Sequence, residues 1–287
     1  MNRRDWLSRI ALASFGASTG LVRARDSALR IGLTAVILAD QAAFLSRWSA
    51  HLAASLQADV AFVARDSYQA ILDMLFAGQV DAAWICGYPY VRFQSRLRLL
   101  AVPLYRGEPR YQSYLIRAKS GKASIGGWAD LRGSVFAYSD PLSNSGWLVA
   151  QAELADAGLR IRDLRRAFFA HGHRNVAEAV AARLAHAGSI DGYVWETMRR
   201  VGIPAAERTE VIWKSPPHGF PPVVAALGGG HPKLDRLQEA LLAMDGDREG
   251  SELLAELNLT GFDAGVPSIY DSIRRLAARV PGSGVRG

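Results

Sequence analysis

Short apolar runs alternate with amphipathic segments along most of the chain. Residues 29–37, LRIGLTAVI, predict a buried strand, and residues 41–57 carry large apolar side chains at intervals of four, as one face of a helix does. The pattern continues with a strand at 59–64, a helix capped by Asp66 or Ser67 that stops at Gly78, and a strand at 80–86. This order predicts a mostly parallel sheet covered by helices, with ligands bound beyond the carboxyl ends of the strands.

The same pattern starts again after residue 118. It predicts strands at 134–138 and 165–170, and helices at 147–157 and 174–187 that end at Gly158 and Gly188. Both halves also pass from a helix through glycine into similar strands, GQVDAAW at 78–84 and GSIDGYVW at 188–195. We therefore expect two similar lobes, although helix–glycine–strand junctions also resemble one another where no repeat exists.

Two extended connections are expected to join the lobes as a hinge. Residues 110–121 have a strand-like pattern, and residues 213–227 contain four prolines, which exclude a helix. Helices are predicted at 232–244, 248–257 and 269–280, the last of them packed on the first lobe. The predicted division is a first lobe of residues 29–115 plus 215–280, a second lobe of residues 116–214, and a frayed glycine-rich tail at 281–287.

The N-terminus, MNRRDWLSRIALASFGASTGLVRARD, has the character of an export signal. A basic start precedes an apolar run, and Val22-Arg23-Ala24 fits a small-residue cleavage site, so residues 1–28 are expected to be a cleaved signal peptide. Arg3 and Arg4 resemble the twin-arginine motif, and ordinary secretion and an uncleaved anchor are the alternatives. Because Cys86 is the only cysteine, an intramolecular disulfide is excluded.

Composition narrows the functional classes. The chain is 49% hydrophobic and 21% charged, as folded globular proteins are. The net charge is +7, but only four of the 34 basic residues are Lys, and the arginines are spread among acidic residues without a basic block. With no nucleic-acid-binding module beside that charge, nucleic acid is not an expected partner.

The loop DPLSNSG, residues 140–146, stands at the mouth of a predicted helix. A helix N-terminus leaves backbone N–H groups unpaired and carries partial positive charge, so it favours an anion. Ser143, Asn144 and Ser145 add side-chain donors, and Gly146 lets a ligand approach the backbone. The loop therefore predicts an anion site, with simple capping by Ser143 or Ser145 as the alternative.

Other polar residues follow the predicted strands and are expected near the same cleft: His171, His173, Cys86, Tyr88, Tyr90 and Glu196. A histidine can donate a hydrogen bond to the anion, and tyrosines offer phenol donors on stiff rings. A carboxylate such as Glu196 suits a ligand that brings a cation or an acidic proton. The alternatives are a buried apolar role for Cys86 and a surface position for Glu196.

Neither catalysis nor a bound metal is expected. The histidines lack metal-ligand spacing, and the sequence has no P-loop or H-E-x-x-H motif. The G-x-S-x-G string occurs only at 16–20, in the predicted signal peptide, and the G-x-G-x-x-G string only at 282–287, in the predicted tail, so neither has the strand-to-helix context that its chemistry needs. Loose Ser, His and Asp residues do not make a catalytic triad. The chain is therefore predicted to be a binding protein without a cofactor.

Several segments together resemble one family: RIGL, AGQVDAAWICGYPYV, GEPRYQSYLIRAKSG, WADLRGSVFAYSDPLSNSGWLVAQAELADAGL, YVWE and WKSPPHGFPPVVA. With the export signal and the Gly172-His173 junction, they resemble the periplasmic binding proteins of phosphate, phosphite and phosphonate transporters, the PhnD-type family. The resemblance covers about residues 29–279 and implies an α/β, two-lobed class II periplasmic-binding-protein fold, with a hinge between two mixed sheets.

The resemblance also implies roles for residues. The D-P-x-S-x-S-G loop of the family grips phosphoryl oxygens, which assigns this role to Ser143, Asn144 and Ser145. The family's histidine corresponds to His173, its first-lobe aromatic residue to Tyr90 or Tyr88, and its acidic residue to Glu196. The chain departs from the family in having Asn144 where Thr is usual and Glu196 where Asp is commoner.

The function implied is capture of a small oxyanion in the periplasm by a monomer that serves an ABC transporter permease. The alternative is a periplasmic sensor component that serves a histidine kinase, for example one that binds arsenite through Cys86.

Overall fold

The computed structural model describes residues 28–34, 42–119, 125–228, 231–280 and 282. The predicted signal peptide lies outside the described residues except for its last residue, and the predicted tail does so except for Gly282. Among the described residues, no helix is both long and apolar enough to cross a membrane.

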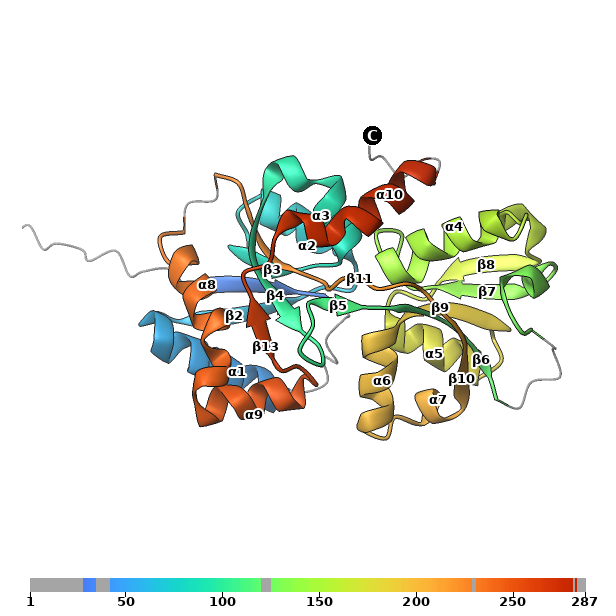
Figure 1. Cartoon of the computed structure of the whole chain (residues 1–287). Coiled ribbons are helices and arrows are strands. Elements are labelled where there is room, and N and C mark those ends of the chain that lie inside the picture. Colours follow the sequence, from blue (N-terminus) through green and yellow to red (C-terminus); the bar gives the residue numbers. More distant parts are fainter. Residues whose placement is uncertain (1–27, 35–41, 120–124, 229–230, 281, 283–287) are drawn as a thin grey trace, which may run out of the picture.

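Two mixed sheets form the centres of two lobes that lie side by side (Figure 1). The first lobe has a six-stranded sheet in the order β13-β4-β12-β3-β1-β2, and the second has a five-stranded sheet in the order β10-β6-β9-β7-β8. In each sheet, three successive strands are parallel and the remaining pairs are antiparallel. The predicted fold class, α/β with two mixed sheets, is confirmed.

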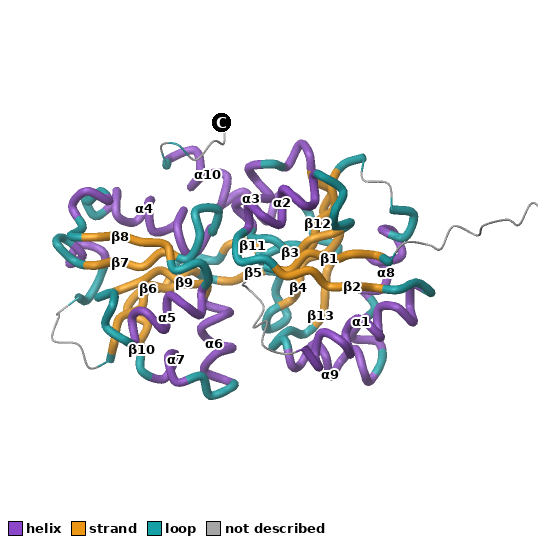
Figure 2. Tube along the Cα trace, turned by 180° about the vertical axis from the view of Figure 1, so that it is seen from behind, coloured by secondary structure: helices purple, strands orange, loops and turns teal. Residues whose placement is uncertain are grey.

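The strands of the first sheet are β1 (Leu29–Leu33), β2 (Val60–Ala64), β3 (Ala82–Trp84), β4 (Leu97–Leu104), β12 (Val223–Ala226) and β13 (Gly261–Asp263). Those of the second sheet are β6 (Ser113–Ala118), β7 (Val135–Tyr138), β8 (Arg166–Phe169), β9 (Ala187–Asp191) and β10 (Thr209–Lys214). Most of their residues are buried, since helices cover both faces of each sheet (Figure 2).

The helices of the first lobe are α1 (Ala42–Leu56), α2 (Tyr68–Phe76), α3 (Gly87–Arg92), α8 (Leu234–Leu242), α9 (Arg248–Glu256) and α10 (Asp271–Arg279). Those of the second lobe are the π-helical turn η3 (Asn144–Leu148), α4 (Val149–Asp156), α5 (His173–Ala181), α6 (Gly192–Arg200) and α7 (Pro204–Glu207). The apolar face predicted for α1 is buried against α8, α9 and β2. The last helix, α10, packs on α3 of the first lobe, as predicted, and also touches α4 of the second.

A short ribbon of two antiparallel strands lies between the sheets. It pairs β5 (Arg110–Tyr111) with β11 (His218–Gly219), and both strands lead into the second sheet on one side and the first sheet on the other. The four prolines keep the second connection extended, as predicted from residues 213–227. Trp84 anchors this connection, because its indole donates to the Pro221 carbonyl at 2.9 Å.

The predicted helix over 174–187 is too long. The structure ends α5 at Ala181, and Arg183, with φ of 61°, turns the chain back toward the sheet. Gly188 therefore lies inside β9 rather than at a helix end, and the proposed match between Gly78 and Gly188 is wrong in register. Glycine is required there because a Cβ would lie 2.5 Å from the Val176 side chain of α5.

Candidate ligand-binding site between the lobes

The carboxyl ends of the parallel strands of both sheets face each other across the space between the lobes. In the first lobe Thr34 follows β1, Tyr68 follows β2 and Cys86 follows β3. In the second lobe Ser139 follows β7, His173 follows β8 and Asp191 ends β9. This is the position at which open α/β sheets place a ligand.

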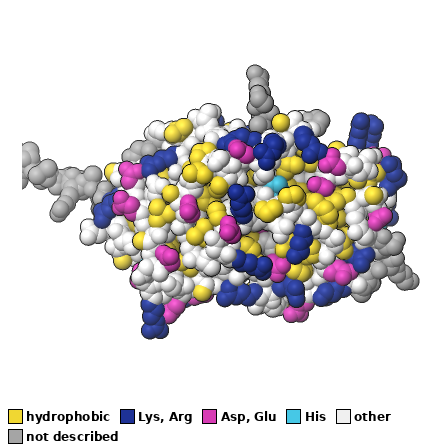
Figure 3. All heavy atoms as spheres, in the orientation of Figure 1, with side chains coloured by type: hydrophobic (Ala, Val, Ile, Leu, Met, Phe, Trp, Pro, Cys, Tyr) yellow, Lys and Arg dark blue, Asp and Glu magenta, His cyan; other side chains and the backbone are white. Residues whose placement is uncertain are grey.

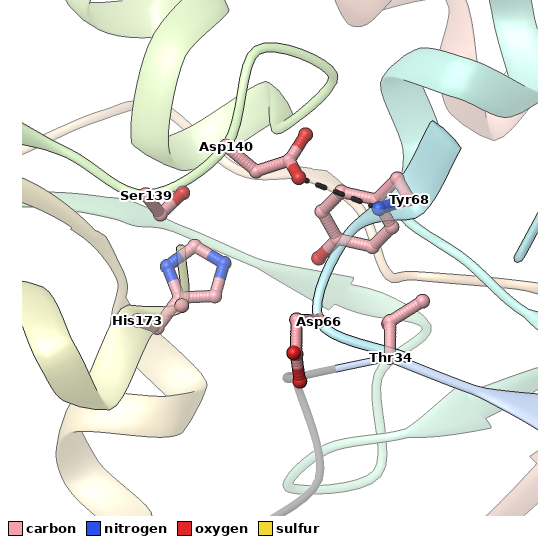
Figure 4. Close-up of a pocket in the computed structure, with 7 residues that line it drawn as sticks. Thr34, Asp66, Tyr68, Ser139, Asp140 and His173 are labelled. Atoms are coloured by element: carbon pink, nitrogen blue, oxygen red, sulfur yellow. Dashed lines mark hydrogen bonds between the residues drawn. The ribbon is translucent and has the colours of Figure 1, made fainter. Parts of the chain in front are cut away.

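A small pocket lies at this junction and encloses about 210 Å³ of empty space, open solvent included. Its lining comes from both lobes: Thr34, Asp66, Tyr68, Ser139, Asp140, Gly172 and His173. In Figure 4 the Tyr68 hydroxyl points toward the His173 ring, and the Ser139 side chain lies beside that ring. None of the seven lining residues is Lys or Arg, so an anion here relies on hydrogen-bond donors and helix dipoles.

The DPLSNSG loop is buried at the same junction, apart from the exposed Pro141. Ser143 does cap η3, since its Oγ accepts from the Gly146 amide at 2.9 Å. The carbonyl of Ser145 accepts from two strand hydroxyls, Ser113 Oγ at 2.8 Å and Ser189 Oγ at 2.6 Å. These bonds fix the loop to the sheet, while the buried Ser145 Oγ has no hydrogen-bond partner among the described residues. The cap of η3 is therefore made by Ser143 and not by Ser145.

The other side of the loop touches the first lobe and the hinge. The amide of Asn144 donates to Cys86 Sγ at 3.2 Å, and Asn144 Nδ2 donates to the Tyr111 hydroxyl on β5 at 3.0 Å. Burial raises the pKa of the Cys86 thiol, although hydrogen bonds from neighbouring backbone amides partly oppose this. The thiol is consequently protonated at neutral pH and acts as a weak acceptor in this contact.

His173 is a neutral donor at this site. Its Nδ1 accepts from the Asp191 amide at 3.0 Å, so in the neutral ring the proton resides on Nε2. Burial lowers the pKa of His173 to about 3. Its Nε2 is buried without a hydrogen-bond partner among the described residues, and the side chain lines the pocket. The neutral ring therefore presents one buried N–H group at the pocket without an acceptor among the described residues.

Asp191 is an acidic residue that sequence reasoning missed. Its Oδ1 caps α6 by accepting from the amides of Tyr193 at 2.8 Å and Val194 at 3.3 Å, but Oδ2 is buried and unpaired within the described residues. Burial raises the pKa of Asp191 to about 7. Glu196 was predicted instead, yet it lies one turn along α6, where it accepts from the Tyr114 hydroxyl at 3.2 Å. An Asp at a strand end, immediately before a helix, was the available signal.

Among the predicted site residues, only His173 lines this pocket, and Tyr88, Tyr90 and His171 make contacts elsewhere or face solvent. Tyr88 stacks on Trp147 of η3, with ring centroids 6.0 Å apart and planes 21° apart, and Tyr90 packs against Tyr270 at 4.7 Å. His171 is exposed and has a φ of 55°. The structure thus brings together Ser143, Asn144, Ser145, Gly146, Cys86 and His173. Sequence reasoning missed Tyr68, because in this segment it considered only the neighbouring Asp66 and Ser67, as candidate helix caps.

Direct contacts cross between the lobes around the pocket. The Asp140 carboxylate accepts from the Leu142 amide at 2.7 Å and from the Tyr68 amide of α2 at 3.3 Å, so it joins the loop to the first lobe (Figure 4). Further away, the Tyr193 hydroxyl donates to the Leu257 carbonyl at 2.5 Å. These bonds hold the carboxyl ends of the two sheets face to face.

A family model described as "ABC transporter, phosphonate, periplasmic substrate-binding protein" matches residues 34–270. The chain belongs to this family. It is 30% identical over 169 residues to the phosphate-import protein PhnD of Mycolicibacterium smegmatis. The aligned region covers 54% of this chain and 52% of that protein. The match thus spans about half the length of this curated relative.

Solved structures agree with the family's fold. A binding component of an ABC phosphonate transporter from Pseudomonas aeruginosa superposes with a TM-score of 0.81 at 20% identity, covering 89% of this chain and 87% of that one. PhnD1 from Prochlorococcus marinus, solved with methylphosphonate, gives 0.77 at 20% identity over 88% and 97%. The alkanesulfonate-binding protein SsuA from Xanthomonas axonopodis gives 0.63 at 14% identity over 92% and 96%. At these identities the likeness shows the fold, that of class II periplasmic binding proteins.

The chain is therefore a phosphonate-type ABC transporter substrate-binding protein, and its family consists of transporter binding proteins rather than enzymes. The same family membership implies the periplasm as its location.

Asp191→Asn is expected to stabilise the phosphonate-type binding protein more at about pH 8 than at about pH 5. The folded state holds the Asp191 proton up to about pH 7, whereas an unfolded Asp loses it near its ordinary pKa of 3.8. Wild-type stability therefore falls as pH rises through this window, by about 1.4 kcal/mol per pH unit at most. Asn caps helices as well as Asp does but carries no charge.

Urea unfolding of both proteins at the two pH values measures this difference. The buried histidines, His173 and His218, titrate in the opposite sense, but they are present in both proteins and cancel in the comparison. A stability offset that is the same at both pH values would show that Asp191 is ionised throughout.

Proposed function

We propose that this chain captures a small tetrahedral oxyanion, a phosphonate, phosphite or phosphate, between its lobes and delivers it to an ABC importer. The observation that carries the proposal is a set of buried, unpaired donors at the junction of the lobes: Ser139 Oγ, Ser145 Oγ and His173 Nε2. Buried polar groups normally have hydrogen-bond partners, and an oxyanion supplies several acceptors at once.

Helix dipoles supply the attraction that charged side chains do not. The η3–α4 segment, α5 and α2 all begin at the junction, and each start carries partial positive charge. Elsewhere on the face in Figure 3, basic and acidic side chains are interspersed. A pocket with neutral donors and helix N-termini suits a small anion.

Closure of the lobes completes the proposed site. Tyr68 and Cys86 come from the first lobe, whereas Ser139, Ser145 and His173 come from the second. The β5–β11 ribbon is the proposed hinge, and it puts the first lobe boundary at residues 110–111 rather than at the predicted residue 115, because β6 pairs within the second sheet. A ligand that touches both lobes binds the closed form better than the open form, and so shifts the population toward closure.

Titration calorimetry with phosphate, phosphite and methylphosphonate tests this function, with arginine as a cationic comparison. We expect the oxyanions to bind, and Ser145→Ala to weaken binding about 10- to 100-fold because one hydrogen bond to an anion is lost. Ser134→Ala is the matched control, since Ser134 Oγ is also buried and unpaired among the described residues but precedes β7 at its opposite end. Binding of arginine alone would overturn the proposal.

Cys86 supports a second candidate function, a sensor component that binds arsenite. The supporting observation is the contact between Cys86 Sγ and the Asn144 amide, which puts the sulfur against the loop. Arsenite is therefore included in the same titration, with Cys86→Ser as the variant. A serine oxygen can still accept from the amide, so oxyanion binding should persist in this variant while any thiol-dependent arsenite binding disappears.

A further inference from the structure

A second set of contacts joins the lobes outside the pocket. In the second lobe, α6 presents Tyr193, Thr197 and Arg200 on one face, because residues four and seven positions apart lie on the same side of a helix. The turn at Leu257 and Asn258 lies opposite them and connects α9 to β13 in the first lobe. In Figure 1, α6 and α9 are found at the lower edges of their lobes. The pocket lining includes none of these five residues.

The Asn258 side chain makes two hydrogen bonds across the lobes. Its Oδ1 accepts from Arg200 Nη1 at 2.7 Å, and its Nδ2 donates to Thr197 Oγ1 at 3.0 Å. A guanidinium can only donate, so the amide oxygen must face Arg200 and the amide nitrogen then faces Thr197. Both ends of this one amide are therefore used to join α6 to the first lobe.

Tyr193 adds a buried contact beside this amide. Its hydroxyl donates to the Leu257 carbonyl at 2.5 Å, and its ring meets that of Tyr105, in the first lobe, edge-on with centroids 5.4 Å apart. Tyr193 and Leu257 are buried, whereas Asn258 is half-buried and Arg200 is exposed. The contact thus has a buried centre and a polar, exposed rim, as small protein interfaces do.

The turn that carries Asn258 is fixed to the first lobe. Asn258 has a φ of 60°, in the left-handed region that Asn adopts more readily than most residues, and its amide donates to the Ala255 carbonyl at 3.1 Å. The helix before it, α9, is tied to α1 by Arg47, which donates to Glu249 at 3.0 Å and to Glu256 at 2.5 Å. Asn258 therefore meets α6 as part of a preformed surface.

The two halves of this contact belong to different lobes, so rotation about the proposed hinge would separate α6 from the turn. A contact made in only one conformation shifts the equilibrium toward that conformation, whichever ligand is present. A ligand that requires the closed form binds less tightly in proportion to the fraction of protein that is open. Contacts outside the pocket can therefore raise the affinity without touching the ligand.

We propose that Asn258, together with Thr197 and Arg200, forms an interlobe latch that stabilises the closed form and thereby sets the strength of ligand binding. Asn258 is a positioning residue, because it acts on the lobes and not on the ligand. The inference rests on the lobe closure that the proposed function includes, but not on which anion is bound. Loss of the latch should consequently change the affinity for every ligand by the same factor.

Asn258→Gly removes the amide and keeps the turn, because Gly adopts a φ of 60° without strain. Calorimetry should show weaker binding of phosphate, phosphite and methylphosphonate by one common factor of about 3 to 10, for two partly exposed hydrogen bonds. Small-angle X-ray scattering without ligand should give a larger radius of gyration than the wild type, and saturating ligand should restore the wild-type value.

Gln57→Gly is the matched control for this variant. Gln57 follows α1 of the same lobe, has a φ of 52° and is exposed, so its replacement makes the same change of residue type at a similar turn. Its affinities and its radius of gyration should equal those of the wild type.

Arg200→Ala tests the other side of the latch. It should also weaken binding, but it should add little in the Asn258→Gly background, because both changes remove the same hydrogen bond. Arg199→Ala is the control, since the Arg199 guanidinium lies over the Trp195 ring, 5.1 Å from its centroid, within the second lobe. Affinity in Arg199→Ala should stay at the wild-type value.

Equal affinities and an equal ligand-free radius in Asn258→Gly and Gln57→Gly overturn the inference and leave the proposed function standing. An affinity loss that differs among the three anions also overturns it, since Asn258 would then act through the pocket. Failure of all three anions to bind overturns the proposed function instead. The latch is then tested by scattering alone, and an unchanged radius contradicts it.

Discussion

Gly146→Ala is expected to weaken oxyanion binding at least about 100-fold, since ligand groups displaced by about 1 Å lose most of their alignment. A Cβ at this position would lie 1.8 Å from Ser139 Oγ and 2.6 Å from Ser139 Cβ, so no rotation of the serine relieves the clash. The loop must move away from β7, which displaces Ser139 and Ser145 together. Overpacking of this kind also costs about 1–3 kcal/mol of stability.

Calorimetric affinity and thermal unfolding measure the two effects. Gly127→Ala is the control within the same lobe, because its Cβ would meet nothing within 4 Å. The double variant Ser139→Gly/Gly146→Ala removes both clashing atoms, so it should recover the melting temperature while affinity stays low without the Ser139 hydroxyl. Wild-type affinity in Gly146→Ala would mean that the ligand binds elsewhere.

His173→Ala is expected to weaken binding about 10- to 100-fold, through loss of a buried donor to an anion. The factor should be the same at about pH 5 and about pH 8, because burial lowers the pKa of His173 to about 3 and the ring stays neutral throughout. A histidine that bound the anion as a cation would instead give a factor that grows as the pH falls.

His186→Ala is a matched control for this variant. His186 Nδ1 also accepts a backbone amide, that of Val135 at 3.3 Å, and the residue belongs to the same lobe but lies at the amino end of β9. Its loss should therefore leave affinity unchanged. If His186→Ala weakens binding as much as His173→Ala does, the effect arises from the lobe's stability rather than from contact with the ligand.

The fold, and the position of the second-lobe residues of the proposed site, could be predicted because both depend on patterns among residues that are neighbours in the chain. The apolar periodicity of α1 and of the strands depends on neighbours in the chain, and a polar loop at a helix start is visible without tertiary information. The DPLSNSG loop and His173 do lie after strands of the second sheet, where the pattern put them, and their role in ligand binding stays a prediction. The error at Gly188 arose because a glycine at a helix end and a glycine under a packed helix look alike in a sequence.

The other side of the site depends on how the two lobes meet. Tyr88 and Tyr90 lie in α3, after β3 has ended at Trp84, and their rings pack against Trp147 and Tyr270 rather than lining the pocket. Tyr68 reaches the pocket because α2 starts there. Asp191 is buried because all of β9, the strand that it ends, is buried. Tyr68 shows no local signal of burial between the lobes, since its amide bonds to Asp140, 72 positions away in the chain.

The stack of Tyr88 on Trp147 joins α3 of the first lobe to η3 of the second. The indole thus belongs to one lobe and its phenol neighbour to the other, so rotation about the proposed hinge would separate the rings. Because the chain has seven tryptophans, a variant that keeps Trp147 as its sole indole is needed for emission to serve as an optical gauge of domain movement.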